Sequence, residues 1–451
     1  MKTKQLLRKL AILPVILLIA ITSVKAQYLL NSDSAFKAGA ANSGRLWGYE
    51  FSDFYFKGHS DSLGRGGSNQ YTGIHADTAA FQSRRIYLGY DYNITTKFSA
   101  ELLLAAEDDG PTATSNLTGN TTTTAGNTIT SGNNDALQDN KLSFYIKLAN
   151  LRWKGIYKGA DLIIGQVTTP SFPLLTEKVW NYRSVERTIS DIRRTPSYDM
   201  GASIQGLFDP ATKNFGYDVM VGNGTSAKPA TTAFRSFYGD VYGYFLNKKL
   251  VIDLYADYSR ESLTPGANDS RQMIKGFIAY NTSATSKGMD PGNGYTIGVE
   301  GFINNLNNDL TITPAAGLGS KFVTNNQATG ISAYIHGDII KKTLRFFARY
   351  DAYNPMSKVN NGLYGATATY AAATSNYKDG ALYGTAAQKA DETYKQGFIT
   401  AGLDYTPARN IHFMPNIWYE HYASQLGGVT GSQSGDYDLV YRMTVFYIFG
   451  K

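Results

Sequence analysis

Apolar and polar side chains alternate in segments of about ten residues from Trp47 to the end of the chain. In the last segment, Leu439 and Tyr441 would lie on one face of a strand, and Asp438 and Arg442 on the other. This arrangement follows because successive side chains of a strand point to opposite sides. An apolar face and a polar face, repeated along so much of a chain, are typical of a β-barrel whose outer surface contacts lipid.

The sequence predicts sixteen strands, at residues 47–56, 83–93, 96–107, 141–153, 159–167, 198–208, 214–222, 235–246, 249–258, 271–281, 294–303, 330–339, 343–353, 395–405, 411–421 and 438–449. Short connections follow the second, fourth, sixth, eighth, twelfth and fourteenth strands, and the remaining ones are long and polar. The connection at 281–293 is longer than this alternation requires. Bacterial barrels have an even number of strands, with short turns at one end and long loops at the other. We therefore predict an all-β fold, a 16-stranded antiparallel transmembrane β-barrel.

The first 26 residues have the pattern of a secretory signal peptide: a basic start, an apolar run from Leu10 to Thr22, and small residues at Val24 and Ala26. The run is shorter than the roughly 20 residues that span a bilayer, and Pro14 interrupts it, so a helical anchor is the weaker interpretation. We predict a signal peptide at 1–26, an N-terminal periplasmic segment at 27–46 and a transmembrane barrel at 47–451, located in a bacterial outer membrane.

The net charge of the chain limits the classes of partner that it can bind. Removing the five basic residues of the predicted signal peptide from the formal net charge of +7 leaves +2. A nearly neutral chain lacks the basic excess of a nucleic-acid-binding protein. The predicted partners are small hydrophilic solutes or anions, together with outer-membrane lipid and lipopolysaccharide. The chain has no cysteine, so no disulfide framework is expected and strand pairing must supply the stability.

The third long connection, Thr168 to Ser197, differs from its neighbours because it contains many bulky apolar side chains. Such a loop should fold against a surface rather than extend into water. We predict that it folds into the lumen and forms a pore constriction from its charged residues, which are Lys178, Arg183, Glu186, Arg187, Arg193 and Arg194. Arginines in a narrow path favour anions. In the alternative interpretation, the same arginines pair with nearby acids and only hold the loop in place.

Charged residues of the predicted strands should line the other side of this path. The period of two turns these side chains toward the lumen: Arg85, Arg345, Arg349, Asp351 and Arg442. The five histidines have no metal-ligand spacing, so neither a metal, a cofactor nor a catalytic set is predicted.

Several short blocks resemble one known family. They are Leu162-Ile163-Ile164-Gly165-Gln166 with Pro170, Glu186-Arg187, Arg194 and Gly201, then Ser83 to Gly89, and Phe347 to Asp351. These residues are similar to the phosphate-selective porin O/P family, in the form found in Bacteroidetes-type bacteria. The resemblance implies a 16-stranded outer-membrane porin, usually a homotrimer, with the third loop folded into the pore. Two features depart from the pattern: Gly450-Lys451 follow the terminal aromatic Phe449, and the lysine cluster behind phosphate preference has no match.

Three functions remain open on this basis. The first is passive diffusion of small hydrophilic solutes through a porin, with a preference for phosphate or other small anions left unsettled. The second is a non-conducting surface adhesin or structural barrel that uses its long loops. The third is an outer-membrane enzyme such as a phospholipase, which would need a Ser/His pair at the lipid-facing rim.

Overall fold

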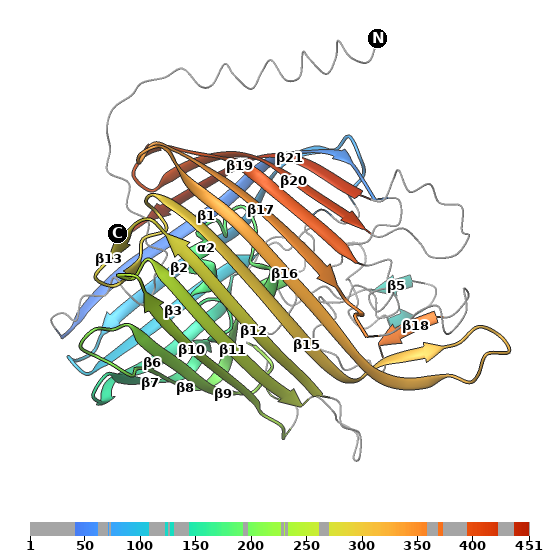
Figure 1. The fold of residues 1–451 in the computed structure, drawn as a ribbon, viewed down its shortest axis with the longest axis horizontal. Helices are drawn as coiled ribbons and strands as arrows, with labels where there is room; N and C mark the ends of the chain where they lie inside the picture. The colour runs from blue at the N-terminus through green and yellow to red at the C-terminus, as the bar shows by residue number, and fades with distance from the viewer. Residues whose placement is uncertain are drawn as a thin grey trace, which may run out of the picture.

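The strands close into one barrel (Figure 1). The computed structural model describes residues 41–61, 71, 74–107, 122–124, 127–129, 144–192, 197–226, 230, 233–260, 270–358, 369–372, 395–422 and 437–450. The barrel strands are β1 (Ser43–His59), β2 (Ala79–Asn93), β3 (Phe98–Glu107), β6 (Tyr145–Tyr157), β7 (Ala160–Thr168), β8 (Tyr198–Leu207), β9 (Phe215–Gly222), β10 (Ser236–Phe245), β11 (Leu250–Arg260), β12 (Ser270–Asn281), β15 (Tyr295–Thr313), β16 (Phe322–Ile340), β17 (Leu344–Asn354), β19 (Gln396–Ala408), β20 (Ile411–Tyr422) and β21 (Tyr437–Phe449). Each strand pairs antiparallel with the next, and β1 pairs with β21, so the sheet has no free edge along its wall.

The prediction of a 16-stranded antiparallel barrel is confirmed, and most strand ends agree within a few residues. The prediction of a long polar loop between 303 and 330 is wrong. There, β15 and β16 continue as a hairpin beyond the other strands (Figure 1). The extension of β15 also pairs with β18 (Thr369–Ala372). Asparagine-rich composition hides this extension, in which Leu306, Leu310 and Ile312 are fully buried.

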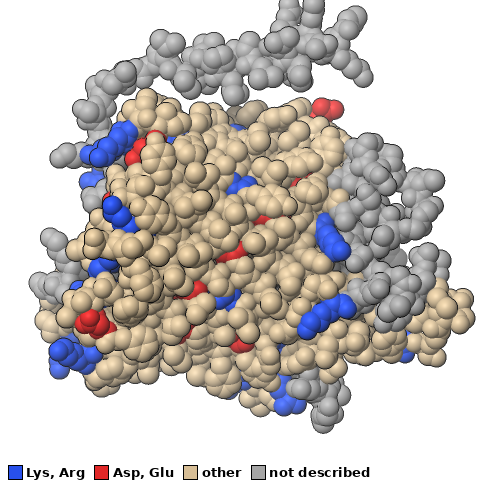
Figure 2. Space-filling view, viewed as in Figure 1, with Lys and Arg blue, Asp and Glu red and all other residues tan. Residues whose placement is uncertain are grey.

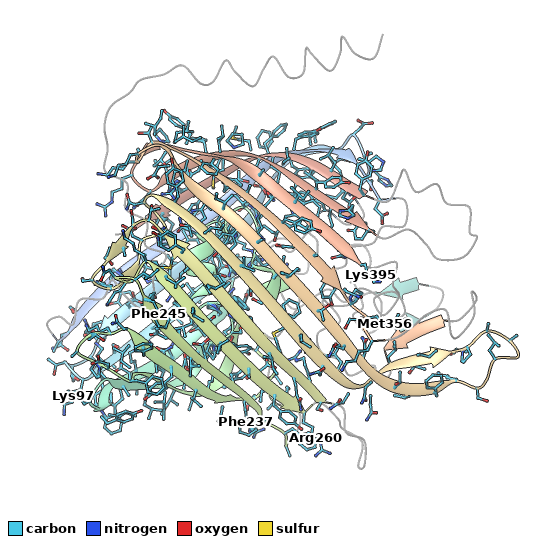
Figure 3. The ribbon with its side chains drawn as sticks, viewed as in Figure 1. Lys97, Phe237, Phe245, Arg260, Met356 and Lys395 are labelled. Atoms are coloured by element: carbon cyan, nitrogen blue, oxygen red, sulfur yellow. The ribbon has the colours of Figure 1, made fainter. Side chains whose placement is uncertain are left out.

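Short turns lie at one end of the barrel and longer loops at the other. Figure 3 shows Lys97, from the turn after β2, at one end and Arg260, Met356 and Lys395 at the opposite end. The turn after β12 is longer because it holds a small hairpin, β13 (Ala284–Thr285) with β14 (Gly288–Met289). The connection after β3 also holds one, β4 (Thr122–Thr124) with β5 (Asn127–Ile129).

The two faces of the wall differ in polarity, as the sequence predicts. Outward side chains such as Ile278 and Tyr441 are 45% and 48% exposed, whereas the inward Asp253 and Lys275 are each 1% exposed. The face shown in Figure 2 is mostly uncharged. A charged side chain in the lipid-facing band costs up to about 2–4 kcal/mol. This surface therefore suits a bilayer. No helix among the described residues is long and apolar enough to cross a membrane.

Glu50 departs from this polarity, since it lies on the outward face near the middle of β1. Three hydroxyl groups donate hydrogen bonds to its carboxylate: those of Ser52 at 2.7 Å, Ser83 at 3.0 Å and Tyr447 at 2.5 Å. These donors come from β1, β2 and β21, the strands at which the barrel closes. The carboxylate therefore has its partners on the outer surface itself.

Candidate functional site

The connection between β7 and β8 crosses the interior of the barrel. It contains two short helices, α2 (Thr176–Trp180) and α3 (Ile189–Ile192), and Figure 1 shows α2 surrounded by the strands. Trp180, Tyr182 and Val185 of this loop are at most 1% exposed. The ring of Tyr182 lies 4.6 Å from that of Phe347, and the ring of Trp180 lies 5.0 Å from that of Tyr334. These partners point inward from β17 and β16, so the loop packs on the wall opposite its own strands.

A residue in the left-handed backbone conformation changes the direction of the loop after α2. Asn181 has a φ of 62°, and its N–H donates to the Glu177 oxygen at 3.0 Å, which ends the helix. Asparagine tolerates this conformation better than most residues. Trp180 then donates from Nε1 to the main-chain oxygen of Glu186 at 2.8 Å. The turn is thereby closed, and residues 182–187 run along the wall.

Three wall arginines hold this segment, and we call them the arginine clamp. Each donates a hydrogen bond to a main-chain oxygen of the loop: Arg84 to Ser184, Arg442 to Val185 at 2.9 Å, and Arg349 to Arg187 at 2.5 Å. Each also contacts a polar side chain of the wall, which is Asp53, Asn416 and Asp351 respectively. Buried peptide oxygens need donors, and charged donors give stronger hydrogen bonds than neutral ones. The clamp therefore fixes the path of the loop across the lumen.

Further contacts from other strands support the same path. They are Lys275 Nζ to Thr176 Oγ1 at 2.9 Å, His336 Nε2 to the Val179 oxygen at 3.1 Å, and Trp418 Nε1 to Glu186 Oε2 at 2.9 Å. Inward residues of β12, β16 and β20 thus join those of β2, β17 and β21. The loop is held from many sides of the barrel rather than by one contact.

Two charged residues of the loop have perturbed acidity. Burial raises the pKa of Glu186, but Arg187, Arg442 and the Trp418 hydrogen bond lower it more, so the pKa lies below its usual value. Burial works against the charged form of Arg183, yet the neighbouring Glu177 carboxylate and other acidic groups raise its pKa well above the usual value. Both groups are therefore charged at neutral pH.

The predicted constriction residues have different environments. Arg183 is buried and pairs with Glu177 and, at 3.4 Å, with Asp191. Lys178 and Arg187 are half-buried. Arg193 and Arg194 lie outside the described residues. The structure thus brings Lys178, Arg183, Glu186 and Arg187 into one loop segment inside the barrel.

The predicted wall residues all point inward, but they contact different neighbours. Arg349, Asp351 and Arg442 belong to the clamp and its pairs, whereas Arg85 lies 3.2 Å from Glu107. Arg345 contacts Asp338 at 2.9 Å and donates to the Pro291 oxygen at 2.9 Å, in the turn after β12. Arg345 therefore holds that turn, and it also interacts with the Tyr182 hydroxyl of the loop.

Sequence reasoning missed Arg84, which the period of two assigns to the outer face. The pairing of β1 with β2 shifts register after Phe51, because Phe51 faces Arg85 while Ser52 faces Ser83. This bulge adds one residue on β2 and turns both Arg84 and Arg85 inward. Two adjacent arginines in an otherwise alternating strand are the signal that could have indicated it.

A cavity remains between the loop and the β1–β9 side of the wall, with a volume of about 120 Å³. Its charged lining consists of Arg45, Lys147, Lys178 and Arg183 against Glu177 and Asp218. Basic groups are thus in excess. Within the described part of the chain, no group of three or more metal-ligating side chains is placed to hold a metal ion.

Comparison with solved structures gives the same fold. The chain is similar to an anion-selective porin from Comamonas acidovorans (10% identity, 90% of this chain and 100% of that chain, TM-score 0.52). It is also similar to the outer membrane channel DcaP of Acinetobacter baumannii (11% identity, 94% and 100%, TM-score 0.52) and to Salmonella typhi OmpF in complex with daunomycin (11%, 91% and 98%, TM-score 0.50). No family model and no curated protein matches the sequence. At these identities the comparison supports the barrel fold, and membership of the phosphate-selective porin O/P family stays a prediction.

Proposed function

We propose that this chain is an outer-membrane porin through which small hydrophilic solutes diffuse passively. One observation carries the proposal: a closed barrel, apolar on its outer face and with many charged and polar residues on its inner wall, is crossed by the clamped loop. An apolar exterior belongs in a bilayer, and a polar interior offers a path for water and solutes. The loop narrows that path and leaves the cavity beside β1–β9.

The proposal includes a mild preference for anions, phosphate among them. Lys178 and Arg183 of the loop face the same cavity as Arg45 and Lys147 of the wall. Positive groups that line a narrow, low-dielectric passage strengthen their field on a passing ion. The nearby acids Glu177 and Asp218 reduce this field, so we expect a modest selectivity.

Recording from planar bilayers tests both parts. Purified protein should give discrete conductance steps, and a salt gradient should give a reversal potential displaced toward that of chloride. A protein that inserts but never conducts contradicts the porin, while a potential displaced toward that of the cation contradicts the anion preference.

A non-conducting structural barrel is the second candidate, and the tight packing of the loop favours it. Loop and wall share a buried cluster that includes Trp180, Tyr182 and Phe347. If this cluster closed the lumen, the native protein would not conduct, but variants that release the clamp would. Fatty-acid release from lipid vesicles would instead support an outer-membrane enzyme.

The family resemblance adds a homotrimer to the proposal. Outer-membrane lipid and lipopolysaccharide would then contact only the part of the apolar surface that faces away from the neighbouring copies. Native mass spectrometry in detergent measures the number of chains, and a monomer would contradict this assembly.

A further inference from the structure

A row of aromatic rings follows β1, and two of its members, Trp47 and Tyr49, line the cavity. Trp47, Tyr49 and Phe51 point inward at alternate positions, and their rings are nearly parallel. The centroids of Trp47 and Tyr49 are 6.1 Å apart, and those of Tyr49 and Phe51 are 5.8 Å apart. Tyr87 of β2 extends the row, since its ring lies 4.5 Å from that of Tyr49. The wall beneath the loop therefore presents a continuous aromatic surface.

A glycine lets the Trp47 indole lie against the sheet. Gly89 is paired with Trp47 across the strands, and a Cβ built on Gly89 would lie 2.3 Å from the indole Cε2. A larger residue there would push the indole away from the wall. The arrangement keeps the ring beside the cavity without filling it.

Trp47 offers the cavity its ring rather than its indole N–H. The residue is 9% exposed and lines the cavity. Its Nε1 is covered, and it lies against Gly89 of the neighbouring strand. A solute in the cavity therefore contacts the ring of Trp47.

Cationic groups flank the aromatic row. Lys147 Nζ lies 5.0 Å from the Tyr87 ring centroid and 5.4 Å from that of Tyr198, and Arg183 donates to the Tyr87 hydroxyl at 3.4 Å. These cations and Lys178 border the same cavity. A negatively charged group of a solute would therefore meet several donors at the edge of the aromatic surface.

The size of the cavity limits the solute. One water needs roughly 10–15 Å³ on the scale of this volume, so about 120 Å³ accommodates on the order of ten non-hydrogen atoms. We propose that the cavity binds a small carboxylate with a flat ring face, such as a sugar acid or an aromatic acid. The ring packs on Trp47 and Tyr49, and the negative charge lies near Lys178 and Arg183. This inference names a solute class for the proposed porin and rests on it for the route of entry.

Block of the ion current tests the binding site. Glucuronate and benzoate each have a ring and a carboxylate, whereas glucose lacks the charge and acetate lacks the ring. We expect either or both of the ring carboxylates to reduce the current at a concentration about fivefold below that of acetate, since a ring contact contributes roughly 1 kcal/mol. They should also act at a lower concentration than glucose, which lacks the charge. The glucuronate and benzoate arms separate a sugar acid from an aromatic acid. Equal block by all four compounds would overturn the proposal.

Substitutions locate the effect. Trp47→Leu should remove the advantage of the ring carboxylates, and Trp47→Phe should keep part of it because a smaller aromatic ring remains. Trp153→Leu is the matched control, since Trp153 lies on the outward face and is 45% exposed. A Trp47→Leu protein that is blocked like the native one would contradict the site.

Fluorescence separates this proposal from the porin itself. Glucuronate or benzoate added to detergent-solubilised protein should change the tryptophan emission of the native chain but not of Trp47→Phe. If the protein binds these solutes without conducting, the porin fails and the site stands. If it conducts without any change in emission or solute-specific block, the site fails and the porin stands.

Discussion

Glu186 shows how a single side chain couples the loop to the wall. Its carboxylate accepts from Trp418 Nε1 at 2.9 Å, while its own main-chain oxygen accepts from Trp180. Burial raises its pKa, but Arg187 and Arg442 lower it further, to below the usual 4.5. A carboxyl group with a lowered pKa in the folded protein stabilises that state above the unfolded pKa.

This shift predicts a pH dependence of the pore. The contribution of Glu186 is fully present above its unfolded pKa of about 4.5 and is lost as the pH falls through the lower folded value. We therefore expect the open-channel conductance to stay constant from neutral pH to about pH 4.5 and to change below it, as the loop loosens. Conductance recorded as a function of pH checks this, and Glu186→Gln should lack that step. A step of equal size in both proteins would show that another group titrates.

The second prediction at this scale concerns Glu50 on the outer surface. Ser83→Ala combined with Tyr447→Phe removes two of its three donors and should destabilise the barrel by about 1–3 kcal/mol, because a desolvated carboxylate loses its hydrogen bonds. The urea midpoint of unfolding, followed by the mobility of unheated protein on gels, measures the loss. Adding Glu50→Leu should restore most of the stability, since the unpaired acceptor is then gone. Continued loss in the triple variant would assign the effect to packing instead.

At the scale of elements, alternation with a period of two was enough to predict the strands. In β17, Arg345, Arg349 and Asp351 point inward, as the pattern of that segment indicates. The pattern fails where an extra residue enters a strand, as at Arg84, and where polar composition hides a pairing strand, as in β15 beyond Asn304. Both failures depend on partners that are distant in sequence.

The candidate site was less predictable than the strands. The apolar content of 168–197 indicates a loop that packs, but the donors to Ser184, Val185 and Arg187 come from β2, β21 and β17. Every residue has a main-chain oxygen, so the sequence does not show which of these oxygens will accept a hydrogen bond from the wall. The predicted arginines of the loop are therefore only one part of the site, and the wall arginines that hold the loop are the other.

We predict that removing the arginine clamp opens the passage through the barrel. Arg349→Ala with Arg442→Ala leaves two loop oxygens without donors and should free the segment, which raises the conductance and lowers the stability. Single-channel recording and urea unfolding measure the two effects.

The control for this variant breaks a buried pair elsewhere in the wall. Lys57→Met removes a partner of Asp438, 2.8 Å away, and Lys57 also donates a hydrogen bond to the main-chain oxygen of Tyr71, which lies outside the loop. It should lower stability while the conductance stays near that of the native protein. A conductance rise in Lys57→Met equal to that of the clamp variant would mean that general loosening, rather than loop release, opens the pore.

At the scale of the whole molecule, the barrel combines an apolar outer surface with a partly apolar interior. The cluster that includes Phe51, Tyr87, Trp180 and Phe446 lies inside the ring of strands, where the loop meets the wall. Charged groups surround this cluster and reach the cavity beside β1–β9. The field along the proposed solute path therefore depends on a few side chains rather than on the nearly neutral charge of the chain.

Lys178 provides the test of that field. Lys178→Glu removes the basic excess of the cavity lining, so the reversal potential in a salt gradient should move toward that of the cation. The matched control is Lys97→Glu, an exposed turn residue at the end of the barrel, which should leave the potential nearly unchanged. Equal shifts in the two variants would indicate that surface charge, not the cavity, sets the preference.

The clamp also has a consequence for how freely this chain can change. Peptide oxygens are present whatever amino acid occupies a position. A replacement of the half-buried Arg187 therefore keeps the hydrogen bond from Arg349, but it changes the charge and size of the side chain at that position. Transport preference could thus drift, or be redesigned, without loss of the framework that holds the loop.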